Sequence, residues 1–494
     1  MAENASDRVQ QRPHAGARAG SHKDLARGPK DAYFRNLYTK APDFRAMALN
    51  DPEFAALFVF ASHGAPLFCN NADANVKISI KGRGRDLNFS DPKAVMQLTK
   101  TLLKVDFDLH IELPEDRLCP PVTNRHNYIL WLKDLLDTTS YDEPGRKAVG
   151  LDIGTGASCI YPLLGCAQRE WSFIATDIDA KSLECAKKNV KINDLESRVR
   201  VIGRKPDDAL IPLDDLKMES IDFTMTNPPF YESVEAMLGS AAGKSRPPFT
   251  ACTGAEVEMV TEGGEVGFIS RIFEESLVLR GRIQWYTAMV GFLSSLTKII
   301  DKLWEHKIDN YAVTEFTQGN KTRRWAIAWS FQPLRPAQSV ARGTKAALSK
   351  NILPAMAETT AFRMPLRGNI GGFAENLSNA IAALELISWN WNKEKLEGVG
   401  RAVDKVWSRP WRRQKKREAE MQLGEKADGG GSKEKLSPEE QVCQFGFKVA
   451  VRVARDHVSV EARWLEGHDE VALESFRGFL KTASEKAVED LEKE

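Results

Sequence analysis

Residues 148–226 alternate short apolar runs with amphipathic stretches, and this alternation limits the fold more than any other feature of the sequence. A helix is expected at 180–193, between the second and third apolar runs. Strands are expected at 148–153, 172–177, 198–203 and 221–226. Strands that alternate with helices form parallel sheets with helices on both faces. The sequence therefore predicts an α/β core with a Rossmann-like, parallel central sheet.

The first expected strand ends in a glycine loop. Asp152 closes the apolar run, and Gly154 and Gly156 follow it, so the backbone can approach a ligand closely. Asp177 ends the second strand 21 residues after Gly156, the distance at which a carboxylate meets ribose hydroxyls. The loop lacks the third glycine of a dinucleotide fingerprint, and no Walker lysine follows it. Neither a dinucleotide site nor a nucleoside triphosphate site is therefore predicted.

The last of these strands runs into the sequence Asn227-Pro228-Pro229-Phe230. Pro229 fixes its own φ angle and biases Pro228 toward an extended conformation, which makes the corner rigid. The amide oxygen of Asn227 and the carbonyl of Pro228 are two hydrogen-bond acceptors, and Phe230 offers an aromatic face. This set suits one task, which is to hold a planar group that carries an exocyclic amine. Taken alone, the corner is also consistent with a rigid turn that has no function.

Together, the glycine loop, the spaced acid and this corner indicate an S-adenosylmethionine-dependent amino-methyltransferase. The glycine loop is expected to pass under the methionine part of the cofactor, and Asp177 to accept from the ribose hydroxyls. The residues expected to bind the cofactor from this pattern are Asp152, Gly154, Gly156, Asp177 and Asn227. The residues expected to be catalytic are Asn227, Pro228, Pro229 and Phe230.

The segment Asp152–Gly165 also resembles the signature of the methyltransferase-like protein 16 family. The resemblance extends from about Tyr33 to Phe331 and is much weaker beyond. Further matches are Asp91–Val95, Asn127–Ile129, Thr261–Glu265, Thr314–Phe316 and Arg324–Phe331. The resemblance implies methylation of adenosine N6 in U6 small nuclear RNA or a related structured RNA, and hence a nuclear protein, with the cytoplasm as the alternative.

The resemblance also assigns a role to Arg125, which matches a family arginine that pairs with the methionine carboxylate. From the sequence alone, Arg125 is equally consistent with a surface arginine. The family has glutamate at the position of Asp177. The aspartate side chain is shorter but carries the same charge. A family contact after the third strand falls near Lys205 and Pro206, where the alignment is ambiguous, so it is not assigned.

Composition is consistent with an intracellular, globular protein of two or three domains. The chain has 494 residues, of which 42% are apolar and 28% charged, and its net charge is +1. Any positive electrostatic potential that attracts RNA must therefore come from local clusters of basic residues. Its seven cysteines show no Cys-x-x-Cys spacing, so no metal site is predicted. No apolar run reaches ~18 residues, so no membrane span is expected.

The expected domains follow from shifts in composition. Residues 1–30 are predicted to be a disordered arm, 31–140 a helical extension, and 141–335 the methyltransferase core. Residues 345–494 are predicted to form an accessory α+β RNA-binding domain, with a disordered basic insertion near 409–440. Within it we expect a helical stretch containing Trp389 and Trp391, a β-hairpin at 445–464 and a helix at 468–493.

Basic residues near the catalytic corner and in the accessory domain are candidates for phosphate contacts. Residues 232–254 are expected to form an RNA-contacting lid, with a plain surface loop as the alternative. Basic residues on helices more often belong to a solvent-exposed face than to an RNA-binding surface. The candidates are Lys244, Arg246, Arg271, Arg282, Lys321, Arg323, Arg324, Arg412, Arg413, Lys415 and Lys416.

Three other functions stay open at this point. A ribosomal RNA adenine-N6 methyltransferase shares the same core. A protein-glutamine N5-methyltransferase also does, but that group typically ends its motif in tyrosine rather than Phe230 and has no reason to carry residues 375–494. A non-catalytic RNA-binding protein could use the fold as a scaffold, although Asn227, Gly154 and Asp177 are all present.

Overall fold

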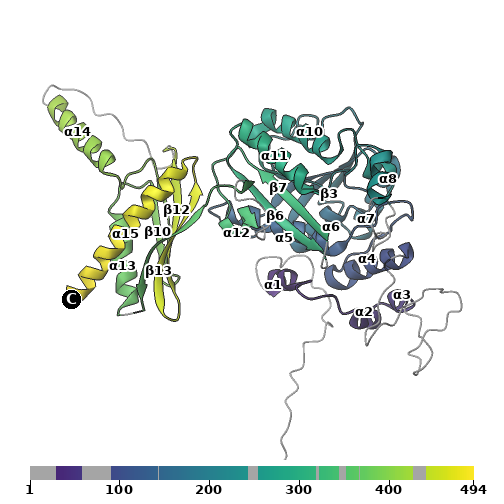
Figure 1. The fold of residues 1–494 in the computed structure, drawn as a ribbon, viewed down its shortest axis with the longest axis horizontal. Helices are drawn as coiled ribbons and strands as arrows, with labels where there is room; N and C mark the ends of the chain where they lie inside the picture. Colours follow the sequence, from purple (N-terminus) through teal and green to yellow (C-terminus); the bar gives the residue numbers. More distant parts are fainter. Residues whose placement is uncertain are drawn as a thin grey trace, which may run out of the picture.

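The computed structural model shows a large α/β body joined to a smaller α+β body (Figure 1). It describes residues 29–57, 89, 91–142, 144–242, 254–318, 322–343, 352–366, 368–426 and 441–493. The predicted arm up to residue 28, the candidates Lys244, Arg246 and Lys321, and residues 427–440 lie outside this part of the chain. No helix within it is long and apolar enough to span a membrane.

The larger body is built on an eight-stranded sheet with the order β3-β2-β1-β4-β5-β7-β6-β8. The strands β1 to β5 pair in parallel, and β7 is antiparallel to both β5 and β6. The expected strands are confirmed as β1 (Ala148–Ile153), β2 (Trp171–Asp177), β3 (Val199–Gly203) and β4 (Ile221–Thr226). The other strands are β5 (Ile283–Val290), β6 (Tyr311–Gln318), β7 (Thr322–Trp329) and β8 (Arg342–Gly343).

Helices cover both faces of this sheet, as the alternating pattern predicts. One face packs on α4 (Pro92–Phe107), α5 (Val122–Thr138), α6 (Ile160–Gln168) and α7 (Ala180–Ile192). The other face packs on α10 (Gly264–Leu279) and α11 (Leu293–Glu305). Short helices complete this body: α1 (Pro29–Asn36), α2 (Phe44–Asn50), α3 (Pro52–Ala55), α8 (Val234–Ala242), α9 (Glu256–Met259), η1 (Arg280–Arg282) and α12 (Gln338–Ala341).

The α/β body continues past the expected boundary at residue 335. Strand β8 pairs with β6, and Ile352 is buried in the core beneath α11. The larger body therefore extends at least to Leu353, because β8 adds to its sheet and both Ile352 and Leu353 pack in its core.

The smaller body is an antiparallel sheet with the order β10-β11-β12-β13-β9. Helices α13 (Ile370–Ala382) and α15 (Glu470–Lys493) pack on one face of this sheet. Its strands are β9 (Glu358–Pro365), β10 (Ser388–Asn392), β11 (Glu397–Ala402), β12 (Phe445–Val453) and β13 (His457–Glu466). The predicted hairpin and C-terminal helix are both confirmed.

The helix predicted around Trp389 and Trp391 is wrong, because both residues lie on β10. Their spacing of two places both indoles on one face of the sheet, where the rings stack with centroids 5.9 Å apart. They lie against Gly398 of β11, where a Cβ would come within 2.5 Å of Trp389. Cross-strand packing against this glycine, which local propensity does not reveal, decides the conformation.

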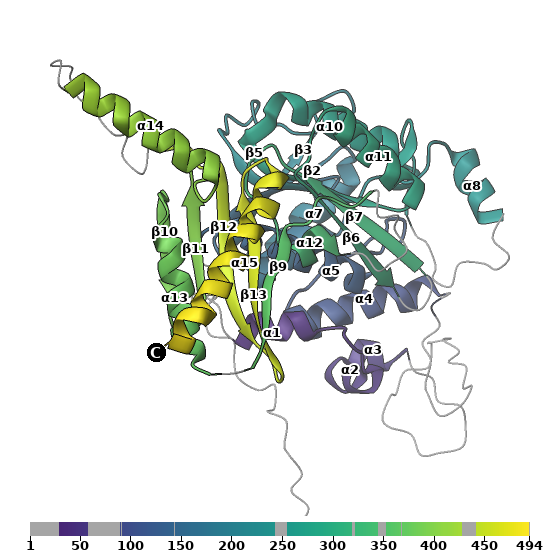
Figure 2. The same cartoon turned by 60° about the vertical axis from the view of Figure 1, so that its left-hand side comes forward.

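The disorder predicted from residue 409 is wrong as far as residue 426, because Arg409–Lys426 forms helix α14. The Oγ of Ser408 accepts from the Trp411 N–H at 3.2 Å and caps the first turn, where Pro410 also fits. Glu418 then pairs with Lys415 at 3.1 Å. Figures 1 and 2 show α14 extending away from both bodies.

Side-chain contacts fix the smaller body against the larger one. Arg335 donates to the Gly467 carbonyl at 2.9 Å and pairs with Asp309 at 2.7 Å. Arg463 donates to the Thr138 carbonyl at 2.6 Å. Buried charged groups with several partners hold one relative orientation, so the accessory domain is docked on the core through this contact.

Candidate cofactor and substrate site

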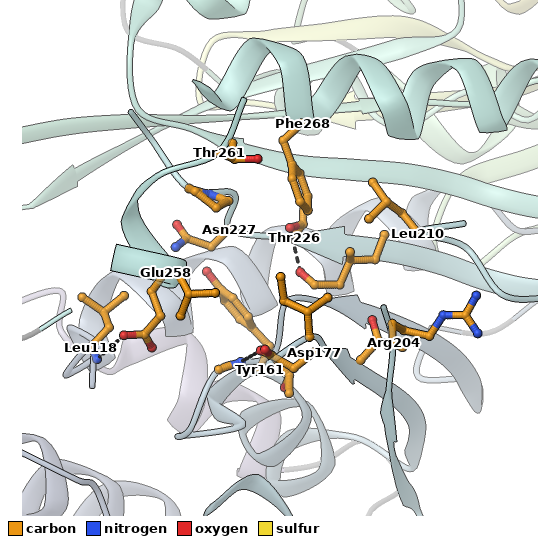
Figure 3. A pocket seen from close by; sticks show the side chains of 18 of the residues that line it. Leu118, Tyr161, Asp177, Arg204, Leu210, Thr226, Asn227, Glu258, Thr261 and Phe268 are labelled. Carbon is orange, nitrogen blue, oxygen red and sulfur yellow. Dashed lines mark hydrogen bonds between the residues drawn. The ribbon is translucent and has the colours of Figure 1, made fainter. Parts of the chain in front are cut away.

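A cavity of about 240 Å³ opens beside the carboxyl ends of β1, β2 and β4 (Figure 3). Residues from the glycine loop, from the end of β2 and from the Asn-Pro-Pro-Phe corner all line it. Ligands of open parallel sheets bind at this edge, where the strand order reverses. The cavity therefore brings together most of the residues that the sequence singles out.

The glycine loop follows β1 directly. Gly154 and Gly156 have φ angles of +73° and +66°, which residues with a Cβ adopt only at a cost. The N–H groups of Gly154 and Thr155 donate to the Thr176 carbonyl, each at 2.9 Å. A Cβ on Gly154 would meet no atom within 4 Å, so the loop leaves open space for a ligand above it.

Asp177 lies at the end of β2, as predicted, and its carboxylate orders the glycine loop. Its Oδ2 accepts from the Gly156 N–H at 2.8 Å, and its Oδ1 accepts from the Asp179 N–H at 2.9 Å. Burial raises the pKa of this carboxyl, while these backbone N–H groups oppose the rise. The side chain lines the cavity, where it can accept from ligand hydroxyls.

Replacing Asp177 by alanine is expected to weaken cofactor binding by ~1–3 kcal/mol, because ribose hydroxyls and the Gly156 N–H lose an acceptor. Calorimetric titration with S-adenosylmethionine measures this. Asp207→Ala is the matched control, because Asp207 is exposed and does not line the cavity. A dissociation constant equal to that of the control would place the ribose contact elsewhere.

Asp152 lies below the loop and is fully buried. Its Oδ2 accepts from the Thr155 hydroxyl at 2.7 Å, while its Oδ1 has no partner in the described part of the chain. Burial is the main reason that the pKa of this carboxyl rises to about 7, and the Asp177 carboxylate adds to the rise. The nearby Arg125 guanidinium acts in the opposite direction.

This pKa has a measurable consequence for the stability of the cofactor-free protein. Because the folded pKa lies above the unfolded value, the folded state binds the proton more tightly between about pH 4 and pH 7. Stability from this group is therefore present at low pH and is lost as the pH rises through 7. The difference in unfolding free energy between the wild type and Asp152→Asn should fall from pH 5 to pH 8. Urea titrations at several pH values measure it, and a constant difference would contradict the assignment.

Arg125 lies on α5 and is buried at the wall of the cavity. Its guanidinium lies over the Tyr161 ring, 5.5 Å from the centroid, and its Nη1 is 3.4 Å from the Met289 sulfur. No carboxylate of the described residues forms an ion pair with it. A buried arginine without an anionic partner suits an anionic ligand group such as a methionine carboxylate.

The corner after β4 presents its amide to the cavity (Figure 3). Asn227 and Pro229 line the cavity, and the Asn227 Oδ1 is buried without a partner among the described residues. Buried polar atoms are normally hydrogen-bonded, so this oxygen is an acceptor kept for a ligand. The Thr226 hydroxyl donates to the Ile153 carbonyl at 2.8 Å and ties the corner to β1.

Phe230 lies beside the cavity rather than in its lining. The Arg324 guanidinium lies over its ring, 5.3 Å from the centroid. A Cβ on Gly291 would come within 2.8 Å of the same ring, so a glycine is needed at that position. Glu265 fixes this approach, because its Oε2 accepts from the Gly291 N–H at 2.6 Å.

The other candidate RNA-binding residues are scattered. Arg323 and Arg324 lie on β7, whereas Arg412, Arg413, Lys415 and Lys416 lie on α14. Arg271 donates to the carbonyls of Pro206 and Asp208, and Arg282 pairs with Asp214 at 2.8 Å. These internal contacts give Arg271 and Arg282 structural roles, and their contact with RNA stays a prediction.

Sequence reasoning missed several residues of the cavity. Tyr161 and Phe268 contribute aromatic rings, and Glu258 contributes a carboxylate. Phe268 lies on α10, three residues after the Thr261–Glu265 segment that resembles the family, so the resemblance pointed to this region. Glu258 lies on the short helix α9, outside every segment that resembles the family, so no sequence pattern indicated it. The cavity as a whole fits S-adenosylmethionine, with acceptors for a ribose, a buried arginine for a carboxylate and an open glycine loop.

A model of a family described as RNA methyltransferase matches residues 29–333 of the chain. The U6 small nuclear RNA (adenine-(43)-N(6))-methyltransferase of Schizosaccharomyces pombe is 47% identical over 264 residues, 53% of this chain and 67% of that relative. The RNA N(6)-adenosine-methyltransferase mettl16 of Danio rerio is 34% identical over 487 residues, 92% of this chain and 97% of that relative.

Solved structures agree with the sequence relatives over the α/β body. The hMettl16 catalytic domain in complex with MAT2A 3′UTR hairpin 1 is 38% identical, with a TM-score of 0.51. The match covers 60% of this chain and 94% of that structure.

Proposed function

Because the chain belongs to the RNA methyltransferase family and is an S-adenosylmethionine-dependent RNA N6-adenosine methyltransferase, we propose that it methylates an adenosine of U6 small nuclear RNA. The name of the Schizosaccharomyces pombe relative supports this substrate, and the structural neighbour bound to MAT2A 3′UTR hairpin 1 supports a structured RNA more generally. A small nuclear RNA is a nuclear substrate, so we also propose a nuclear location. Fluorescence microscopy of the tagged protein tests that location.

The observation that carries the activity is the Asn227 Oδ1, which is buried at the edge of the cavity and has no partner among the residues that the structure describes. Adenine N6 carries two N–H groups, and Asn227 Oδ1 and the Pro228 carbonyl would accept one each. The N6 lone pair is delocalised into the ring, so the amine is a poor nucleophile. Two acceptors localise the lone pair and stabilise the positive charge that grows on nitrogen during transfer.

S-adenosylmethionine supplies an electrophilic methyl group on a sulfonium when it is bound. The chain's own residues hold the reactants and need no strong base. Phe230 would stack on the adenine, which must leave any local base stack to reach the corner. The buried Arg125 guanidinium suits the methionine carboxylate, and Asp177 suits the ribose. The proton of N6 then leaves to solvent.

Two basic surfaces are the proposed RNA contacts outside the catalytic corner. Arg324 on β7 lies over the Phe230 ring, and its neighbour Arg323 is exposed on the same strand and pairs with Glu315 at 3.3 Å. Both suit the phosphates that flank the target base. The exposed basic residues of α14 suit phosphates farther along the RNA. Because the accessory domain is docked on the core, α14 has a defined position relative to the catalytic corner.

The experiment uses purified protein, labelled S-adenosylmethionine and synthetic U6 RNA. We expect one adenosine to be labelled, with the label lost when that adenosine is replaced by guanosine. Ribosomal RNA and total protein are the comparison substrates. Equal labelling of ribosomal RNA or of a scrambled hairpin would overturn the U6 proposal, and label on protein would overturn RNA as the substrate.

A further inference from the structure

Glu258 is a carboxylate of the cavity that belongs to none of the motifs discussed above. It lies on α9, and its Oε2 accepts from the backbone N–H groups of Leu118 at 2.9 Å and Ala255 at 2.8 Å (Figure 3). These two bonds orient the carboxylate and leave Oε1 for another partner.

The second oxygen faces the glycine loop. A Cβ on Gly156 would lie 3.7 Å from the Glu258 Oε1, so this atom lies beside the glycine loop at the wall of the cavity that both residues line. No hydrogen bond or ion pair reaches Oε1 from the described residues. Arg117, whose charge acts to lower the pKa of Glu258, forms its ion pairs with Asp116 and Asp179, each at 2.9 Å. Burial and the Asp177 carboxylate both raise the pKa of Glu258, and the N–H groups of Ala255 and Leu118 oppose the rise.

Glu258 is also connected to the catalytic corner through the backbone. The Tyr231 N–H donates to the Met259 carbonyl at 3.0 Å, and the Thr261 N–H donates to the Tyr231 carbonyl at 2.9 Å. Tyr231, which follows Phe230, therefore pairs through its backbone with Met259 and Thr261, which follow Glu258. A ligand that binds the Glu258 side chain also restrains the backbone beside the substrate-binding corner.

We propose that Glu258 is a further cofactor ligand, whose Oε1 accepts a hydrogen bond from S-adenosylmethionine, and that this bond links cofactor binding to the position of Tyr231. The donor is a polar hydrogen of the cofactor near the glycine loop, either a ribose hydroxyl or the α-ammonium group. The linkage predicts that cofactor binding orders residues 255–261 together with Tyr231.

Glu258→Gln is the decisive variant. Its amide oxygen can still accept from Leu118 and Ala255, which places the NH₂ group where Oε1 was. The atom that faces the cofactor changes from acceptor to donor, while the anchoring of α9 is kept. We expect S-adenosylmethionine and S-adenosylhomocysteine to bind about 10–100-fold more weakly in calorimetric titrations, as for loss of a bond to a charged group.

Glu256→Gln is the matched control, because Glu256 lies on the same helix, is exposed and does not line the cavity. Equal affinity of the two variants for S-adenosylhomocysteine would overturn the assignment. Titration with 5′-methylthioadenosine, which lacks the amino-acid part, distinguishes the two donors. If Glu258→Gln also binds 5′-methylthioadenosine more weakly than the wild type does, the donor is a ribose hydroxyl. If the two proteins bind 5′-methylthioadenosine equally well, the donor is the α-ammonium group.

Hydrogen exchange of the wild-type protein tests the linkage without any substitution. Saturating S-adenosylhomocysteine should slow amide exchange at Tyr231 and Thr261, and Glu258→Gln at saturation should show a smaller effect. Exchange at both amides that is unchanged by the ligand in the wild type would overturn the linkage. Thermal unfolding of the cofactor-free variants verifies that both are folded.

Discussion

Replacing Asn227 by alanine is expected to lower the rate of methyl transfer by roughly 10²–10³, the cost of losing one charge-stabilising contact at a reacting centre. The Asn227 Oδ1 is a buried acceptor without a partner among the described residues, so its removal leaves no internal bond broken. Cofactor affinity should fall far less than the rate, because Asn227 is only one of the expected cofactor ligands and the glycine loop, Asp177 and Arg125 are unchanged. Single-turnover rates and calorimetric titrations measure the two effects.

The control for this prediction is Asn227→Asp, which keeps an acceptor oxygen at the same place. It should retain more activity than the alanine variant. If Asn227→Ala kept more than about a tenth of the wild-type rate, the acceptor role would be wrong, because such a contact typically contributes far more.

Neutralising helix α14 is expected to weaken RNA binding by roughly 10²–10³ at low salt, without a change in the adenosine that is methylated. The variant replaces four basic residues by glutamine, which is also a good helix former. These residues are Arg412, Arg413, Lys415 and Lys416. Each lost phosphate contact should remove ~0.7–0.9 from the slope of log affinity against log salt. Binding isotherms at several salt concentrations give both quantities.

The matched control replaces four exposed basic residues of α15 by glutamine, so that the change in net charge is the same. They are Arg477, Lys481, Lys486 and Lys493. If the two variants had equal slopes of log affinity against log salt, RNA binding would depend on the overall charge of the protein and not on α14. An unchanged slope and affinity for the α14 variant would remove this helix from the RNA-binding surface and leave the catalytic assignment untouched.

Local patterns were sufficient where one segment decides its own structure. The alternation at 148–226 predicted four parallel strands within a residue of their observed bounds. The pair Gly154 and Gly156 predicted a glycine loop directly after the first strand, and the structure has that loop, with both glycines at positive φ angles. Such features depend on residues that are close in the sequence, so the sequence carries them directly.

Other features depend on contacts between elements, which local preference does not reveal. Trp389 and Trp391 form a strand because Gly398 on the neighbouring strand leaves space for their indoles. The internal role of Arg271 is a second example: its guanidinium donates to the carbonyls of Pro206 and Asp208, while its contact with RNA stays a prediction. Gly398 lies on the next strand of the same hairpin, whereas Pro206 and Asp208 lie 65 and 63 residues before Arg271, and the periodicity of a single segment indicates neither contact.

The sequence by itself determined the chemistry of this protein: the glycine loop, the acid that follows it and the Asn-Pro-Pro-Phe corner specify the cofactor and the reacting amine. Only the tertiary structure decided which atoms are left without partners. It placed Glu258, 102 positions after Gly156 in the chain, so that its Oε1 faces the loop, and it docked the accessory domain through Arg335 and Arg463. The physical reason is that hydrogen-bond satisfaction in a buried site is a property of the packed fold.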